Sequence, residues 1–198
     1  MCLYVYAAPL PTTACDFWRM VWEQRTRLIV RLTKLKENVY PNKTKVKCFK
    51  YWPDDVDQFS GIEIQMVKSL TVSEGLIINT FQVRKGSECR KVEHLSFLNW
   101  PDHGVPENVQ PFLNLVQWFD KLYNPQEDGR PITHCSAGIG RTGTLICVRS
   151  LIQMIEEKKE VDVFNFILKM RQNRINMVQT EMQYIFIHDA LLEYLHYQ

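Results

Sequence analysis

The sequence of 198 residues lacks any hydrophobic run close to the roughly 18 residues that a helix needs to span a bilayer. It also has little glycine and proline, 8 and 9 residues, and no repeat or low-complexity segment, which argues against a fibrous or disordered chain. Residues 1–11 are apolar but carry no basic segment and are interrupted by Pro9 and Pro11, which disfavours a signal peptide. We therefore expect a globular protein that is not inserted in a membrane.

An excess of charge of one sign is missing as well, since 24 basic and 22 acidic residues leave a net charge of +2. We find no charge signature of nucleic-acid binding and expect no such partner. The six cysteines show neither CxxC nor mixed Cys/His spacing, so the sequence predicts neither a zinc site nor a disulfide framework. Their positions are Cys2, Cys15, Cys48, Cys89, Cys135 and Cys147.

Lysines do gather in one stretch of the chain: Lys34, Lys36, Lys43, Lys45, Lys47 and Lys50. The simplest interpretation is the solvated face of a hairpin. The alternative is a surface that favours acidic substrates or acidic surfaces.

Hydrophobic residues make up 45% of the chain and aromatic residues 12%, enough for one substantial core. In the first half, a helix is predicted from Thr12 or Thr13 to about Arg25, followed by strands at 28–32, 43–52, 62–72, 76–85 and 90–99. In the second half, helical spacing predicts helices at 109–122, 142–157, 162–171 and 180–195, with a short strand at 131–134. Asn108 and Asp162 are the expected caps of two of these helices. The pattern predicts a single α/β domain over residues 1–198, with a central twisted mixed β-sheet flanked by helices.

The stretch HCSAGIGRTGT, from His134 to Thr144, joins the short strand 131–134 to the helix that begins near Thr142. Amides at the start of a helix have no intrahelical acceptor and lie at the positive end of the helix dipole. A glycine-containing loop at that point forms a cradle for phosphate, and Arg141 can close it with a planar fork of donors. The sequence therefore predicts a phosphate-binding loop at a strand-to-helix turn.

Cys135 lies within this predicted anion site. Thiolates at helix N-termini are stabilised, and the thiolate is the nucleophilic form of cysteine. Cys135 is thus a candidate for attack on phosphorus. The spacing of Cys135 and Arg141 alone leaves open a buried free cysteine beside a glycine-rich turn.

Together with other segments, this stretch closely resembles the signature of the tyrosine-specific protein phosphatases. WPDHGVP (residues 100–106) is similar to the family's mobile acid loop, and QTEMQY (179–184) to its water-positioning loop. PLPTTACDFWRMVWEQ (9–24) resembles the segment beneath the site, and CFKYWP (48–53) a family strand. These motifs occur in the family order and span nearly the whole chain. Dual-specificity phosphatases usually lack both WPD and QTxxQ, so the tyrosine-specific class is favoured.

The resemblance implies hydrolysis of phosphotyrosine in proteins through a phosphocysteine, without metal or cofactor. Cys135 would be the nucleophile, and Asp102 would act first as the general acid and then as the general base. Without the other motifs, Asp102 would be interpreted as part of a Pro-Asp turn. Arg141 and the loop residues Ser136, Ala137, Gly138, Ile139 and Gly140 would hold the phosphate. Gln179 and Gln183, four residues apart at a helix start, would orient the hydrolytic water.

The resemblance also implies a set of supporting residues. Thr142 would donate to the Cys135 sulfur, and His134 would order the loop, with a plain core histidine as the alternative. Trp100 and Pro106 would be the hinge ends of the acid loop, and Glu37 the carboxylate that fixes Arg141. Arg171 and Arg174 match arginines that support the loops, although arginines near a helix C-terminus also act on the helix dipole alone.

Members of this family carry an N-terminal portion with helices, an early strand and a loop whose tyrosine stacks on the substrate ring. The sequence has none of it ahead of Pro9, so we expect the ring-recognition loop to be absent. The first hypothesis is an active phosphatase; the second is a weak or non-hydrolytic phosphotyrosine-binding decoy, and the third a fragment of a longer phosphatase. Because Cys135 must remain reduced, we expect the cytosol, with the nucleus as an alternative. The sequence does not determine the oligomeric state.

Overall fold

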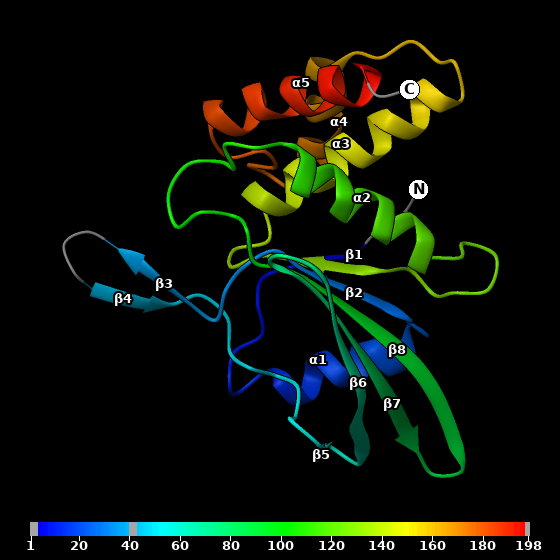
Figure 1. Ribbon diagram of the computed structural model, residues 1–198. Helices are drawn as coiled ribbons and strands as arrows, with labels where there is room; N and C mark the ends of the chain where they lie inside the picture. Colours follow the sequence, from blue (N-terminus) through cyan, green and yellow to red (C-terminus); the bar gives the residue numbers. More distant parts are fainter. Residues whose placement is uncertain (1–3, 40–42, 197–198) are drawn as a thin grey trace.

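A seven-stranded mixed β-sheet forms the centre of the computed structural model, which describes residues 4–39 and 43–196 (Figure 1). Its strands, in spatial order, are β1 (Tyr4–Tyr6), β9 (Ile132–His134), β2 (Leu28–Arg31), β8 (Glu88–Phe97), β7 (Leu76–Lys85), β6 (Ile62–Ser73) and β5 (Val56–Phe59). The first four are parallel, and the remaining pairs are antiparallel. A separate antiparallel pair, β3 (Lys36–Val39) with β4 (Lys43–Val46), extends away from the body of the molecule (Figure 1). We call this pair the β3–β4 ribbon.

Helices cover both faces of the sheet. One face carries α2 (Gln110–Leu122), α3 (Gly140–Glu156), α4 (Val163–Asn173) and α5 (Glu181–His196), and the other carries α1 (Ala14–Glu23) (Figure 1). Strand β2 therefore buries all four residues, as expected for a parallel strand covered on both sides. Leu28 and Val30 pack in the core beneath the four helices, whereas Ile29 packs in the core beneath α1. No helix in the described part of the chain is both long and apolar enough to cross a bilayer.

The predicted α/β class and mixed sheet are confirmed, and most elements lie within two residues of their expected bounds. The hairpin of β6 and β7 forms where two β-branched runs are separated by residues 73–75. The Asp162 side chain caps α4 by accepting from the Asn165 amide at 2.9 Å. At α2 the Asn108 side chain accepts from the Gln110 amide, although Val109 occupies the cap position.

The strand predictions failed in three ways: one strand is shorter than expected, three were missed, and an early strand is present where none was expected. The expected strand at 43–52 ends at Val46, because the following residues leave the ribbon and bury Cys48 and Tyr51 beside α1. Strands β1, β3 and β5 were missed, since each has only three or four residues and no long alternating pattern. Strand β1 also means that an early strand does precede Pro9, contrary to expectation. The turn predicted at residues 40–42 lies outside the described residues.

Candidate active site

A cavity of about 380 Å³ lies where β9 passes into α3. Cys135, Arg141, Asp102 and Gln179 all line it, although they come from segments far apart in the sequence. Trp100 and Gln183, from the same segments as Asp102 and Gln179, also line it, as do Glu37 and Lys47. The fold thus brings the predicted nucleophile, guanidinium and acid to one site.

Cys135 is the first residue of the cradle loop, residues 135–140, and only 5% of it is exposed. The Gly138 amide donates to its sulfur at 3.3 Å, so the loop turns a backbone N–H inward as the anion-cradle prediction requires. Gly138 has φ +71°, and a Cβ there would lie 2.1 Å from the Tyr6 carbonyl oxygen. The Ala8 amide donates to the Ser136 carbonyl at 2.9 Å. Strand β1 and the segment after it therefore pack against the cradle loop and stabilise its conformation.

Arg141 forms a bidentate ion pair with Glu37. Both terminal nitrogens contact the carboxylate, Nη2 to Oε2 at 2.9 Å, and the Glu37 side chain is fully buried. Thr33 donates to Glu37 at 3.0 Å, and the Lys47 ammonium lies 3.5 Å away. Burial alone would raise the pKa of Glu37, but the hydrogen bond and charge of Arg141 hold it below its usual value. The predicted contact between Glu37 and Arg141 is therefore present, and it fixes the guanidinium as a fork.

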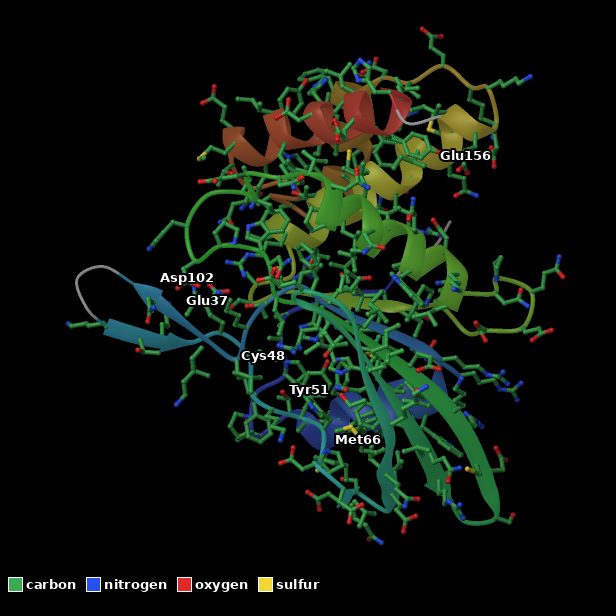
Figure 2. All side chains as sticks on the ribbon, in the orientation of Figure 1. Glu37, Cys48, Tyr51, Met66, Asp102 and Glu156 are labelled. Carbon is green, nitrogen blue, oxygen red and sulfur yellow. The ribbon has the colours of Figure 1, made fainter. Side chains whose placement is uncertain are left out.

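Asp102 accepts a hydrogen bond from the Asn38 amide at 2.8 Å, and the Lys34 ammonium lies 3.5 Å from its other oxygen. Figure 2 shows Asp102 and Glu37 close together at the root of the β3–β4 ribbon. The hydrogen bond from the Asn38 amide has the largest effect and lowers the pKa of Asp102; desolvation opposes it, and Lys34 and Arg141 add to the lowering. In this arrangement the ribbon favours the ionised carboxylate.

Trp100 anchors the segment that carries Asp102. Its ring is 1% exposed and packs against Phe112 and Phe186, while Nε1 donates to the Gly104 carbonyl at 3.0 Å. Arg141 Nη2 also donates to the Pro101 carbonyl at 3.3 Å. These contacts fit a loop held at its first residue, as expected for Trp100; for Pro106 there is no comparable contact among the described hydrogen bonds.

His134 belongs to a buried chain of hydrogen bonds that also contains Tyr51 and His94. The Tyr51 hydroxyl lies 2.8 Å from His134 Nε2 and 2.9 Å from His94 Nε2, and His134 Nδ1 lies 3.0 Å from the Cys135 carbonyl oxygen. A carbonyl can only accept, so Nδ1 of His134 carries the proton and Nε2 accepts from Tyr51. Tyr51 must then accept from His94 Nε2, which leaves His94 Nδ1 without a proton and without a hydrogen-bond partner in the described part of the chain.

Burial keeps both of these rings neutral. It lowers the pKa of His134 to about 4, against the effect of the Cys135 carbonyl, and it lowers the pKa of His94 well below its usual value. The nearby Arg31 charge acts in the same direction on both rings. His134 thus orders the backbone of Cys135, in agreement with the structural role expected for it.

The two glutamines do not form the equivalent pair that their spacing suggested. Gln183 is 7% exposed, and its oxygen accepts from the Gln179 amide at 2.9 Å and the Thr180 amide at 3.4 Å. The side-chain amide of Gln183 also lies against Gly140, where an added Cβ would be 2.8 Å from Gln183 Nε2. Gln179 is exposed and lines the cavity. Gln183 therefore holds the start of α5 against the cradle, whereas the side-chain amide of Gln179 forms no hydrogen bond with a described residue.

Three supporting predictions can be compared with contacts. The hydrogen bond expected from Thr142 to the Cys135 sulfur is not formed, and the buried Thr142 hydroxyl has no partner among the described residues. Arg171 donates to the carbonyls of Met177 and Val178, just before Gln179. Arg174 donates to the carbonyls of Ala137 and Gly138 at 3.1 Å each. Both arginines thus contact the loops that they were expected to support.

A comparison with protein families agrees with this geometry. The family model described as "Protein-tyrosine phosphatase" matches residues 3–193. The chain belongs to the protein-tyrosine phosphatase family. It is 44% identical over 188 residues to receptor-type tyrosine-protein phosphatase S of Gallus gallus and 43% identical to receptor-type tyrosine-protein phosphatase F of Danio rerio. Each match covers 93% of this chain but only 12% and 10% of the relatives, so the chain corresponds to about a tenth of their length.

Several residues of this phosphatase-family site were not found from the sequence. The quoted CFKYWP motif pointed to Tyr51 without a role, and nothing in the sequence pointed to His94. Asn38 acts through its backbone amide, which no side-chain pattern reveals. Two further thiols are buried, and burial raises the pKa of Cys48 and of Cys147 to about 12. Such a shift favours the protonated thiol over the nucleophilic thiolate.

Proposed function

We propose that this chain hydrolyses phosphotyrosine in proteins through a phosphocysteine intermediate. The observation that carries the proposal is one cavity lined by Cys135, Arg141 and Asp102. Membership of the protein-tyrosine phosphatase family supports the same reaction. The printed names of the relatives also describe tyrosine-protein phosphatases.

In the first step the Cys135 thiolate attacks phosphorus and the bond from phosphorus to the tyrosine oxygen breaks. Arg141, already oriented by Glu37, and the amides of the cradle loop stabilise the charge on the equatorial oxygens. Asp102 transfers its proton to the leaving phenolate oxygen. Tyrosine leaves with a neutral hydroxyl, and phosphate remains on sulfur.

In the second step water attacks phosphorus, and the bond from phosphorus to sulfur breaks. Asp102, now a carboxylate, accepts a proton from that water. We assign orientation of the water to Gln179, whose amide faces the cavity, and the placing of Gln179 to Gln183. Inorganic phosphate is released, and the Cys135 thiolate is regenerated. All of these steps use side chains and amides of this chain.

The test measures phosphate release from p-nitrophenyl phosphate, a phosphotyrosyl peptide and the matching phosphoseryl peptide. The wild type should act on the first two and discriminate against the third. Cys135→Ser should show no turnover yet still bind the phosphotyrosyl peptide. Asp102→Ala should lower kcat on the peptide about 100- to 10,000-fold. It should lower kcat less on p-nitrophenyl phosphate, whose leaving group needs no proton.

Equal and negligible turnover by the wild type and Cys135→Ser would reject the enzymatic proposal in favour of a phosphotyrosine-binding decoy. The presence of Asp102 in the cavity favours the enzyme, because a binder has no need of an acid. We also propose a reducing compartment, the cytosol or the nucleus, because the mechanism needs a free thiolate.

A further inference from the structure

The β3–β4 ribbon has a row of lysines on one of its faces. In the antiparallel register Glu37 is opposite Lys45, and residues directly opposite each other in a sheet point to the same face. Successive residues alternate between faces, so Lys43 lies on the face of Glu37 and Lys45, and Lys36 lies on the other. Lys47, just beyond the end of β4, continues the row and lies 3.5 Å from Glu37.

This row begins at the candidate active site. Glu37 and Lys47 both line the cavity that holds Cys135. Lys45 and Lys43 then follow at the roughly 7 Å spacing of alternate residues in a strand. The ribbon extends outward from the body of the molecule (Figure 1), so the row runs from the edge of the cavity into solvent.

Few carboxylates neutralise these charges. Lys43 and Lys45 are exposed, and neither forms an ion pair with a described residue. Glu37 is the only acidic residue between Thr33 and Lys50, a stretch with six lysines. Its charge is already shared by Arg141 and Lys47. The row therefore carries uncompensated positive charge, although the whole chain has a net charge of only +2.

We propose that Lys43, Lys45 and Lys47 form a docking row for acidic side chains that flank the phosphotyrosine of a protein substrate. The inference rests on the proposed function, because it places the phosphotyrosine in the cavity beside Lys47. A peptide leaving that cavity in an extended conformation repeats its side chains at the same spacing of about 7 Å. Aspartate or glutamate at alternate positions can then face successive lysines.

The test compares two phosphotyrosyl peptides, one with acidic residues and one with neutral residues at alternate flanking positions. The wild type should prefer the acidic peptide in kcat/KM. Lys43→Gln combined with Lys45→Gln should lower kcat/KM for the acidic peptide about tenfold, because each exposed ion pair changes an equilibrium roughly threefold. Activity on the neutral peptide and on p-nitrophenyl phosphate should stay within about twofold, because neither substitution touches the cavity.

The matched control is Lys36→Gln combined with Lys68→Gln, which removes the same charge from two exposed sites outside the row. Lys36 lies on the opposite face of the same ribbon, and Lys68 on strand β6. This control should keep the preference for the acidic peptide. High salt should abolish the preference in the wild type, since the Debye length falls from about 10 Å at 0.1 M to about 3 Å at 1 M.

Measurements of peptide affinity distinguish failure of this inference from failure of the proposed function. Affinities for both peptides are measured in the Cys135→Ser background, which needs no turnover. A preference for the acidic peptide that depends on Lys43 and Lys45 supports the docking row even if the wild type hydrolyses nothing. Equal affinities for the two peptides overturn it. Binding to vesicles containing anionic lipid that requires Lys43 and Lys45, without a preference among peptides, would overturn it in favour of a membrane surface.

Discussion

At the scale of single residues, Asp102 is subject to two opposing requirements. It must be protonated to act as a general acid, yet the Asn38 amide and Lys34 stabilise its ionised form and lower its pKa. A bound phosphate brings negative charge into the same cavity, and negative charge favours the protonated form. The pH range of the first step therefore depends on how far the bound phosphate raises the pKa of Asp102 against the lowering by Asn38 and Lys34.

This balance predicts a change in pH dependence for Lys34→Ala. Above the pKa of Asp102 the protonated fraction falls, so kcat on a phosphotyrosyl peptide should decline as pH rises. Removal of the Lys34 charge raises that pKa and should move the decline to higher pH. The measurement is kcat against pH for the wild type and Lys34→Ala, with Lys36→Ala as the control because Lys36 has no such contact. An unmoved profile in Lys34→Ala would show that Lys34 does not act on the acid.

The sequence revealed the residues that carry chemistry better than those that tune it. Cys135, Arg141 and Asp102 could be assigned because the motifs that contain them resemble those of the tyrosine-specific phosphatases. Glu37 was assigned from the resemblance, and its contact with Arg141 exists. Asn38 and Asp102 are 64 positions apart in the sequence, and Tyr51 and His94 are 43 positions apart. Such pairs follow from tertiary packing, which no local pattern encodes.

At the scale of elements, the cradle loop depends on strand β1, which the sequence did not predict. Its three residues pair with β9 and place the Tyr6 carbonyl directly against Gly138. The place of the following segment, residues 9–24, beneath the site was predicted only from its resemblance to a family segment. A three-residue strand acquires its structure only from its neighbour in the sheet, so it leaves no signal of its own.

Gly138→Ala tests this dependence, with Gly61→Ala as a control. Both glycines have positive φ, at +71° and +75°, so an alanine at either site incurs a similar backbone strain of about 1 kcal/mol or more. A Cβ at Gly61 meets nothing within 4 Å, whereas one at Gly138 meets the Tyr6 carbonyl. Gly61→Ala should lower Tm modestly and keep kcat on p-nitrophenyl phosphate. Gly138→Ala should lower Tm further and reduce kcat at least tenfold; similar behaviour of the two variants would contradict a close contact between β1 and the loop.

At the scale of the whole molecule, two neutral histidines lie in the middle of the sheet. His94 and His134 are fully buried and joined through Tyr51, and burial lowers the pKa of both. Unfolding exposes them to water, where the usual pKa is about 6.5. Below that pH the unfolded chain therefore binds protons that the folded chain does not.

The folded state should consequently lose stability as pH falls from about 6.5 toward 4. Each histidine contributes at most about 1.4 kcal/mol per pH unit in this range, and the contribution of His134 levels off near pH 4. Thermal unfolding at several pH values should show a falling Tm. His94→Gln should show a shallower slope, since glutamine can still donate to Tyr51 but does not titrate. A titration of the His134 ring near pH 6.5 by NMR would refute the buried neutral state.

The root of the β3–β4 ribbon contacts two groups of the proposed mechanism through neighbouring residues: the Glu37 side chain binds Arg141, and the Asn38 amide donates to Asp102. Lys43 and Lys45 lie on the facing strand, without contact to either group among the described hydrogen bonds and ion pairs. Mutations in β4 can therefore accumulate without loss of catalysis, while those at Glu37 cannot. A gene duplicate could diverge in its choice of substrate through a few codons of β4 and retain its reaction unchanged.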